Sequence, residues 1–186
     1  MMRLAWLTDI HLDFLTLQHI QDFCYKALES KADAFIIGGD ISVAPALHTH
    51  LRILEHYWKR PIYFVLGNHD YYRGSIKDVR GALPSFLSKH DNLHWLLLEG
   101  VVRLSDSTAL IGHGCWADGR LGLGSASEIM LNDYALIEEL TGLGQVALFR
   151  KLNVLGDRAA AELQPVLQEA LASYSEVIVV THVPPF

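Results

Sequence analysis

Cysteine and long apolar runs are what this sequence has least of, and each shortage excludes a class of protein. The two cysteines, Cys24 and Cys115, have no Cys-x-x-Cys partner, so no disulfide framework is indicated and a reducing compartment suits the thiols. No apolar run approaches the roughly 18 residues of a membrane span, and too few apolar residues precede Asp9 for a secretory signal. A cytoplasmic protein without membrane association is the expectation.

Positive charge is also scarce. The chain has 15 Lys and Arg residues and 21 Asp and Glu residues, which gives a formal net charge of −6. Proteins that bind nucleic acid or anionic membranes through charge usually carry a basic patch, and no run of Lys and Arg stands out along the chain. What remains, with 51% hydrophobic and 19% charged residues, is typical of a globular chain long enough for one domain with a substantial core.

Strands and helices alternate in the first half of the chain. Short apolar runs predict strands at 3–8, 34–37 and 61–66, and apolar side chains at helical spacing predict helices at about 17–30, after Pro45, and at about 75–87, where Pro84 should kink or divide the helix. This rhythm predicts right-handed crossovers and a parallel sheet.

The second half has a different pattern. Three short apolar runs at 93–98, 101–104 and 108–112 are joined by hairpin-sized connections, so we expect antiparallel neighbours. A glycine-rich loop over about 113–127 follows, then helical patterns over about 128–140 and 145–174 with breaks near Gly156 and Pro165, and a last strand at 176–181.

Side chains that bind metals or transfer protons follow four of the predicted strands. They are Asp9 and His11, then Asp40, then Asn68 with His69 and Asp70, and finally His182. Taken singly, each has an ordinary explanation as a helix cap, a turn residue or a surface histidine. Ordered together at successive strand ends, they should meet at one edge of the sheet. A cluster of carboxylates there would repel, and a bound cation removes that cost.

The types of these side chains constrain the metal. Asp, His and Asn without Cys suit Mn, Fe, Zn or Ni, whereas imidazole disfavours Ca and Mg. Asp9 and His11 are two residues apart and therefore share one side of a strand end. Asp40, a lone carboxylate between such groups, could bridge two ions about 3.5–4 Å apart.

In order and setting, four motifs resemble those of the calcineurin-like metallophosphoesterases: Asp9-x-His11, Gly39-Asp40, Gly67-Asn68-His69-Asp70 and Thr181-His182. The resemblance runs from Leu4 to the last residue. It implies a single α/β domain over residues 1–186, built as a four-layer α/β/β/α sandwich of two mixed sheets with a dinuclear centre at the strand ends.

The resemblance also implies roles for the individual residues. Asp9 and His11 would bind one divalent ion, Asp40 would bridge both, and Asn68 and His182 would bind the second. His69 would be the catalytic histidine that binds the phosphate or protonates the leaving oxygen, and Asp70 would orient its imidazole.

The implied activity is hydrolysis of a phosphate mono- or diester of a small molecule or nucleotide, by attack of a hydroxide that bridges the two metal ions. Two alternatives stay open: a non-catalytic scaffold on the same fold that binds a protein partner, and a nuclease with the same dinuclear chemistry. The retained ligands weigh against the first, and the acidic charge balance weighs against the second.

The sequence departs from the family at its end. The family ends in Gly-His-x-His, which gives each metal one more histidine, whereas only Val-Pro-Pro-Phe follows His182 here. We therefore expect residues 1–186 to lack the C-terminal part of the domain. Asp13 lies near the first motif, but nothing in the sequence gives it a role, and His113 is at least as well explained as an ordinary residue between a strand and a loop.

Overall fold

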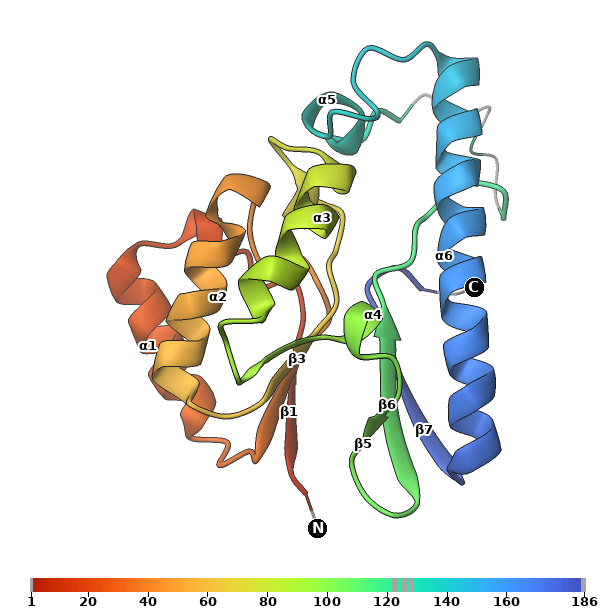
Figure 1. Ribbon diagram of the computed structural model, residues 1–186. Coiled ribbons are helices and arrows are strands. Elements are labelled where there is room, and N and C mark those ends of the chain that lie inside the picture. The colour runs from red at the N-terminus through yellow and green to blue at the C-terminus, as the bar shows by residue number, and fades with distance from the viewer. Residues whose placement is uncertain (1, 122–123, 125–126, 128, 185–186) are drawn as a thin grey trace.

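Two sheets form the centre of the computed structural model, which describes residues 2–121, 124, 127 and 129–184 (Figure 1). The first sheet is parallel throughout and has the order β1 (Leu4–Leu7), β2 (Ala34–Ile37), β3 (Ile62–Phe64) and β4 (Leu93–Trp95). In the second sheet, β6 (Thr108–His113) pairs antiparallel with β5 (Val102–Arg103) and parallel with β7 (Glu176–Thr181).

Helices cover the outer face of each sheet. The first sheet carries α1 (Leu17–Leu28), α2 (Ala44–Trp58) and α3 (Ile76–Leu87), and the second carries the long α6 (Gln145–Ser173), as Figure 1 shows. Shorter elements lie in the connections: the 3₁₀ helices η1 (Leu12–Phe14) and η2 (His69–Tyr71), and the one-turn helices α4 (Leu96–Glu99) and α5 (Asp133–Leu136). None of the described helices has both the length and the apolar character needed to cross a membrane.

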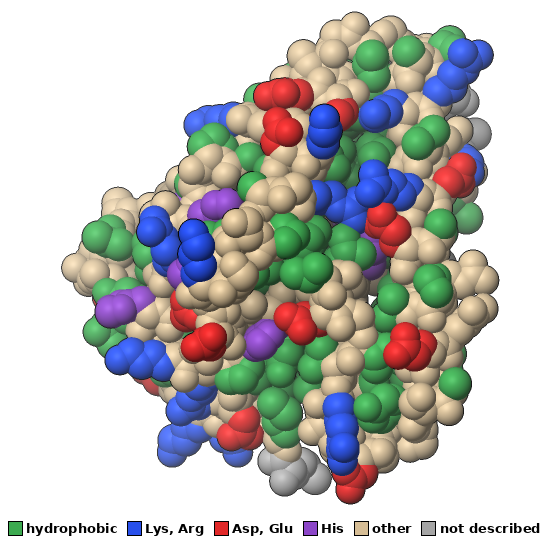
Figure 2. Space-filling view, viewed as in Figure 1, with side chains coloured by type: hydrophobic (Ala, Val, Ile, Leu, Met, Phe, Trp, Pro, Cys, Tyr) green, Lys and Arg blue, Asp and Glu red, His purple; other side chains and the backbone are tan. Residues whose placement is uncertain are grey.

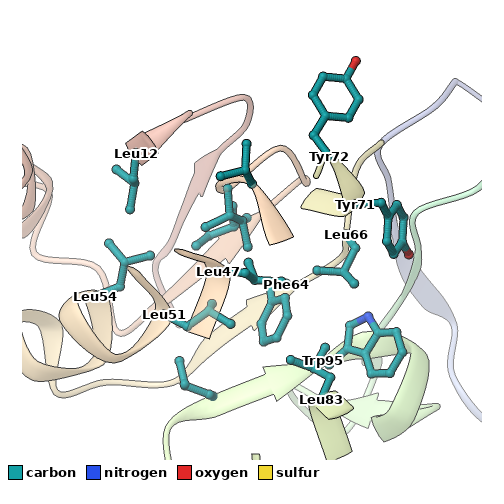
Figure 3. Packing of buried hydrophobic residues seen from close by; sticks show 14 of the residues in the cluster. Leu12, Leu47, Leu51, Leu54, Phe64, Leu66, Tyr71, Tyr72, Leu83 and Trp95 are labelled. Carbon is teal, nitrogen blue, oxygen red and sulfur yellow. The ribbon is translucent and has the colours of Figure 1, made fainter. Parts of the chain in front are cut away.

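Alternation of side chains along the strands divides the core into layers. Phe35 and Ile37 of β2 belong to the large cluster beneath the helices, whereas Ile36 between them faces the second sheet. Figure 3 shows Leu47 and Leu51 of α2 packed over Phe64 of β3. A smaller cluster lies between the two sheets, and a third joins β6 to α6. The expected α/β/β/α architecture is confirmed, although only the second of the two sheets is mixed.

Three expectations about single elements are wrong, and Pro84 does not divide α3. Residues 93–98 do not form one strand, because β4 ends at Trp95 and pairs parallel with β3, while Leu96 begins α4 and packs between the sheets. In the predicted helix at 128–140, only α5 is helical among the described residues, and residue 128 lies outside them. The third concerns α6, which continues through both Gly156 and Pro165.

The continuity of α6 has a physical cause. Pro165 is exposed, so its missing N–H and its ring lie on the solvent side, where water can satisfy the freed carbonyl group. Leu163, Val166 and Leu167 pack toward β6 on the other side of the helix. The tertiary contacts therefore override the local preference to break. In α3 likewise, Pro84 lies inside an uninterrupted helix.

Candidate metal centre

The predicted ligands of the first motif lie on strained backbone at the carboxyl end of β1. Asp9 and His11 have φ values of 53° and 40°, and Asp40, at the end of β2, has 52°. Residues other than glycine rarely adopt such angles, and they concentrate at functional sites. Two backbone hydrogen bonds hold the loops together, from Asp9 N to Gly39 O at 3.2 Å and from His11 N to Asp40 O at 3.0 Å.

Asp40 is the centre of the cluster. Its side chain is buried, and Oδ1 accepts a hydrogen bond from the backbone N–H of His69 at 2.9 Å. His182 Nε2 lies 3.4 Å from Oδ1, and His11 Nε2 lies 3.7 Å from Oδ2. The two oxygens of one carboxylate therefore face imidazoles from the two sheets, which is the geometry of a bridging ligand. Burial raises the pKa of Asp40, and the neighbouring His182 is the largest influence that lowers it.

The electron pairs of three side chains converge on one point beside Asp40. His182 Nδ1 lies 2.9 Å from the carbonyl oxygen of Gly38, and because a carbonyl only accepts, this nitrogen carries a proton. When the ring is neutral, Nε2 therefore has a lone pair. Asn68 donates from Nδ2 to Asp133 at 2.8 Å, so its Oδ1 is the atom turned toward His182 Nε2 at 3.1 Å. With a neutral His182 and no cation, these lone pairs and the Asp40 carboxylate repel.

A second group of possible ligands lies on the other side of Asp40. Ligand atoms of His11, Asp13 and His69 lie within 4.8 Å of one another, as do those of Asp9, Asp40 and His182. Two buried polar atoms here, His11 Nδ1 and Asp13 Oδ1, have no hydrogen-bond partner in the described structure. Buried polar atoms are normally paired. The donor types and these orphaned atoms fit a site for divalent cations.

Two glycines leave the space that the cluster occupies. A Cβ on Gly67 would lie 2.1 Å from Asp40 Oδ1, and one on Gly39, whose φ is +96°, would lie 2.7 Å from His182 Nδ1. Both contacts are far shorter than van der Waals distance. The Gly-Asp and Gly-Asn-His-Asp motifs therefore need their glycines for the close approach of strand ends.

The expectation that Asp70 orients the His69 imidazole is wrong. Asp70 is fully buried, and its carboxylate accepts hydrogen bonds from the backbone N–H groups of Ile41, Ser42 and Gly67, each at 2.8 Å. Burial raises the pKa of Asp70, and these N–H groups counteract that rise. Its carboxylate therefore ties the loop after β2 to the loop after β3 instead of holding the imidazole.

The carboxylate that does contact the imidazole is Asp13, which sequence reasoning missed. Asp13 Oδ2 lies 3.0 Å from His69 Nε2, and both side chains are almost completely buried. Asp13 belongs to η1, the short helix that follows His11. The one available signal was a third polar residue at the same spacing in Asp9-x-His11-x-Asp13. The other predicted residues lie together at the carboxyl ends of strands from both sheets: Asp9, His11, Asp40, Asn68 and His69 follow strands of the first sheet, and His182 follows β7 of the second.

Comparison with known proteins gives a family and a fold. A family model described as calcineurin-like phosphoesterase matches residues 2–186. One similar solved structure is the crystal structure of TT1561 from Thermus thermophilus, with a TM-score of 0.62 and 16% sequence identity, covering 100% of this chain and 70% of that one. At this identity the likeness shows the fold alone. No curated protein matches the chain.

Proposed function

Because this chain belongs to the calcineurin-like phosphoesterase family, we propose that it hydrolyses phosphate mono- or diesters of small molecules or nucleotides with the help of two divalent ions. The observation that carries the proposal is the convergence of electron pairs from His182 Nε2, Asn68 Oδ1 and Asp40 Oδ1. A bound cation would relieve the repulsion among these atoms.

The proposal divides the ligands between two ions, although ligand atoms of Asp9 lie within 4.8 Å of those of Asp40 and His182. We assign Asp9 and His11 to one ion and Asn68 and His182 to the other, with Asp40 shared because each of its oxygens faces one side. Mn, Fe, Zn and Ni suit this donor set. Such a pair of ions, when bound, would supply water of lowered pKa and neutralise charge on the phosphoryl oxygens.

His69 is the proton donor in this proposal. Its Nε2 is held by Asp13, and Nδ1 has no partner among the described residues, so it is available to a phosphoryl or leaving oxygen. The Asp13 carboxylate fixes the orientation of the imidazole ring. Burial of both side chains keeps water from competing for this contact.

The test is hydrolysis together with metal content. The full chain is loaded with Mn²⁺ and assayed with p-nitrophenyl phosphate and bis(p-nitrophenyl) phosphate. Asp40→Asn should bind less metal and lose about 100-fold or more in turnover, since the shared ligand is gone. The control is Asp91→Asn, which removes the same charge at an exposed position outside the ligand cluster. It should leave both quantities unchanged.

Each outcome of this assay is decisive. Unchanged turnover and metal content in Asp40→Asn would overturn the proposal. Metal binding by the wild-type chain without hydrolysis of either ester would favour a non-catalytic scaffold on the same fold.

A further inference from the structure

A hollow of about 510 Å³ lies between α3 and α6, and basic side chains line it. Lys77 and Arg80 come from α3, and Lys151 and Arg158 come from α6. Figure 2 shows Lys and Arg side chains gathered in the hollow between these two helices. The cluster contrasts with the net charge of −6 for the whole chain. The sequence does not reveal it, because the two helices are far apart along the chain.

The two carboxylates at this place are already engaged. Glu139 accepts hydrogen bonds from Ser75 Oγ at 3.0 Å and from the backbone N–H groups of Ile76 and Lys77 at 2.9 Å, and so caps the start of α3. Glu162 accepts from Arg80 at 2.6 Å and from Arg158 at 2.7 Å, and it also contacts His113 at 2.9 Å. Two carboxylates therefore face four cations, and the hollow keeps an excess of positive charge.

The excess positive charge belongs to Lys77 and Lys151. Within the described residues, neither Lys77 nor Lys151 has a hydrogen bond or ion pair from its side-chain amine, and Lys151 is half-buried. Lys77 is exposed. Like charges gathered in one hollow repel, and an anion placed among them reduces the repulsion.

Glu162 positions the arginines before any ligand binds. The Arg80 guanidinium is bound by Glu162 and lies 5.9 Å from the centroid of the Trp95 ring, with 16% of its side chain exposed. A guanidinium has five N–H donors, so binding to Glu162 leaves donors for a second anion. Glu162 also binds Arg158, whose side chain is 62% exposed, so Arg80 is the more firmly positioned of the two, and its positioning reduces the entropy lost on binding.

We propose that this hollow, the α3–α6 basic site (Lys77, Arg80, Lys151 and Arg158), binds a small, multiply charged phosphate-type anion such as pyrophosphate. Its volume lies within the roughly 300–1,000 Å³ of small-molecule sites, and ammonium and guanidinium groups are the usual partners of phosphate oxygens. None of the candidate metal ligands lines the hollow. The basic site is thus separate from the phosphoesterase centre.

The first experiment is calorimetric titration of pyrophosphate into the metal-free protein. Three proteins are compared: wild type, Lys77→Gln/Lys151→Gln, and the control Lys26→Gln/Lys89→Gln, whose lysines do not line the hollow. Loss of one charge-assisted hydrogen bond weakens binding by about tenfold. We therefore expect the first double variant to bind about tenfold to a hundredfold more weakly, while the control matches wild type. Equal affinities in all three proteins, or no binding to wild type, would overturn the proposal.

A second experiment locates the anion without any substitution. Acetylation of lysines by acetic anhydride is followed by mass spectrometry with and without pyrophosphate. Lys77 and Lys151 should be modified several-fold more slowly when pyrophosphate is present, and Lys26 and Lys89 should not change. Equal protection of all four lysines, or none, would contradict the assigned place. Because both experiments use metal-free protein, their failure is distinct from failure of the proposed hydrolysis.

Discussion

At the scale of single residues, three buried aspartates of the centre have different tasks because they meet different partners. Asp40 faces imidazoles on both sides, Asp70 accepts three backbone N–H groups, and Asp13 contacts the His69 ring. The same carboxylate group therefore serves as a candidate bridging ligand, as a tie between backbone segments and as the partner of a histidine.

Replacing Asp13 by Asn tests its role as a positioning residue. We expect turnover of an aryl phosphate to fall by about 10- to 100-fold, with KM and bound metal nearly unchanged, because the amide still hydrogen-bonds His69 but no longer stabilises its charged form. Asp13→Glu should restore part of the rate. Loss of bound metal in Asp13→Asn would contradict this role and would make Asp13 a ligand, as its place beside His11 permits.

Asp13, and not Asp70, contacts the His69 imidazole. This difference shows what the sequence could and could not predict about the candidate centre. The grouping of the candidate ligands was predictable because each follows the carboxyl end of a strand, and the ends of neighbouring parallel strands lie close together. The partner of His69 was not, because the N–H groups that occupy Asp70 belong to Ile41 and Ser42, at the end of another strand. Such contacts depend on how two loops pack against each other. The spacing of residues within one motif carries no information about that packing.

At the scale of elements, the strands and helices that alternate with clear periodicity were predicted closely, and those under tertiary control were not. The strands at 34–37 and 176–181 have the predicted bounds. Leu96 has the apolar character of a strand residue, yet it belongs to α4 because the chain must cross there from one sheet to the other. The helix α6 is one element because its packed face outweighs Gly156 and Pro165.

Glu162 joins three elements, and its replacement tests that role. It binds Arg80 of α3, Arg158 of its own helix and His113 of β6. Burial alone would raise the pKa of Glu162, but these partners lower it from the ordinary value of 4.5 to about 2. Glu162→Gln should reduce the free energy of unfolding in urea by about 2 kcal/mol at pH 7. Glu169→Gln, at an exposed position of the same helix, is the control.

The pH dependence of this effect has a definite sign. Since the pKa of Glu162 is lower in the folded chain, its stabilisation is complete above pH 4.5 and is lost as the pH falls toward 2. The wild type should lose stability more steeply than Glu162→Gln in this range, so the difference between them should shrink. A difference that stays constant from pH 7 to pH 3 would contradict the assignment.

At the scale of the whole molecule, the candidate centre spans the boundary between the two sheets. Asp9, Asp40 and Asn68 follow strands of the first sheet, whereas His182 follows β7 of the second. The apolar cluster between the sheets is small, with Ile36 and Val65 on one side and Leu110 and Val180 on the other. Ions bound by ligands from both sheets would therefore add a substantial part of the free energy that holds the sheets together.

This coupling predicts where metal should slow hydrogen exchange. A ligand at 100 times its Kd adds about 2.7 kcal/mol, so amides of β7 that exchange when the sheets separate should slow by up to about 100-fold with saturating Mn²⁺. Amides of α1, on the outer face of the first sheet, should change much less. Asp40→Asn should abolish the effect and Asp91→Asn should keep it. Equal slowing in β7 and α1 would mean that metal stabilises the fold as a whole, and no slowing in β7 would mean that His182 is not a ligand.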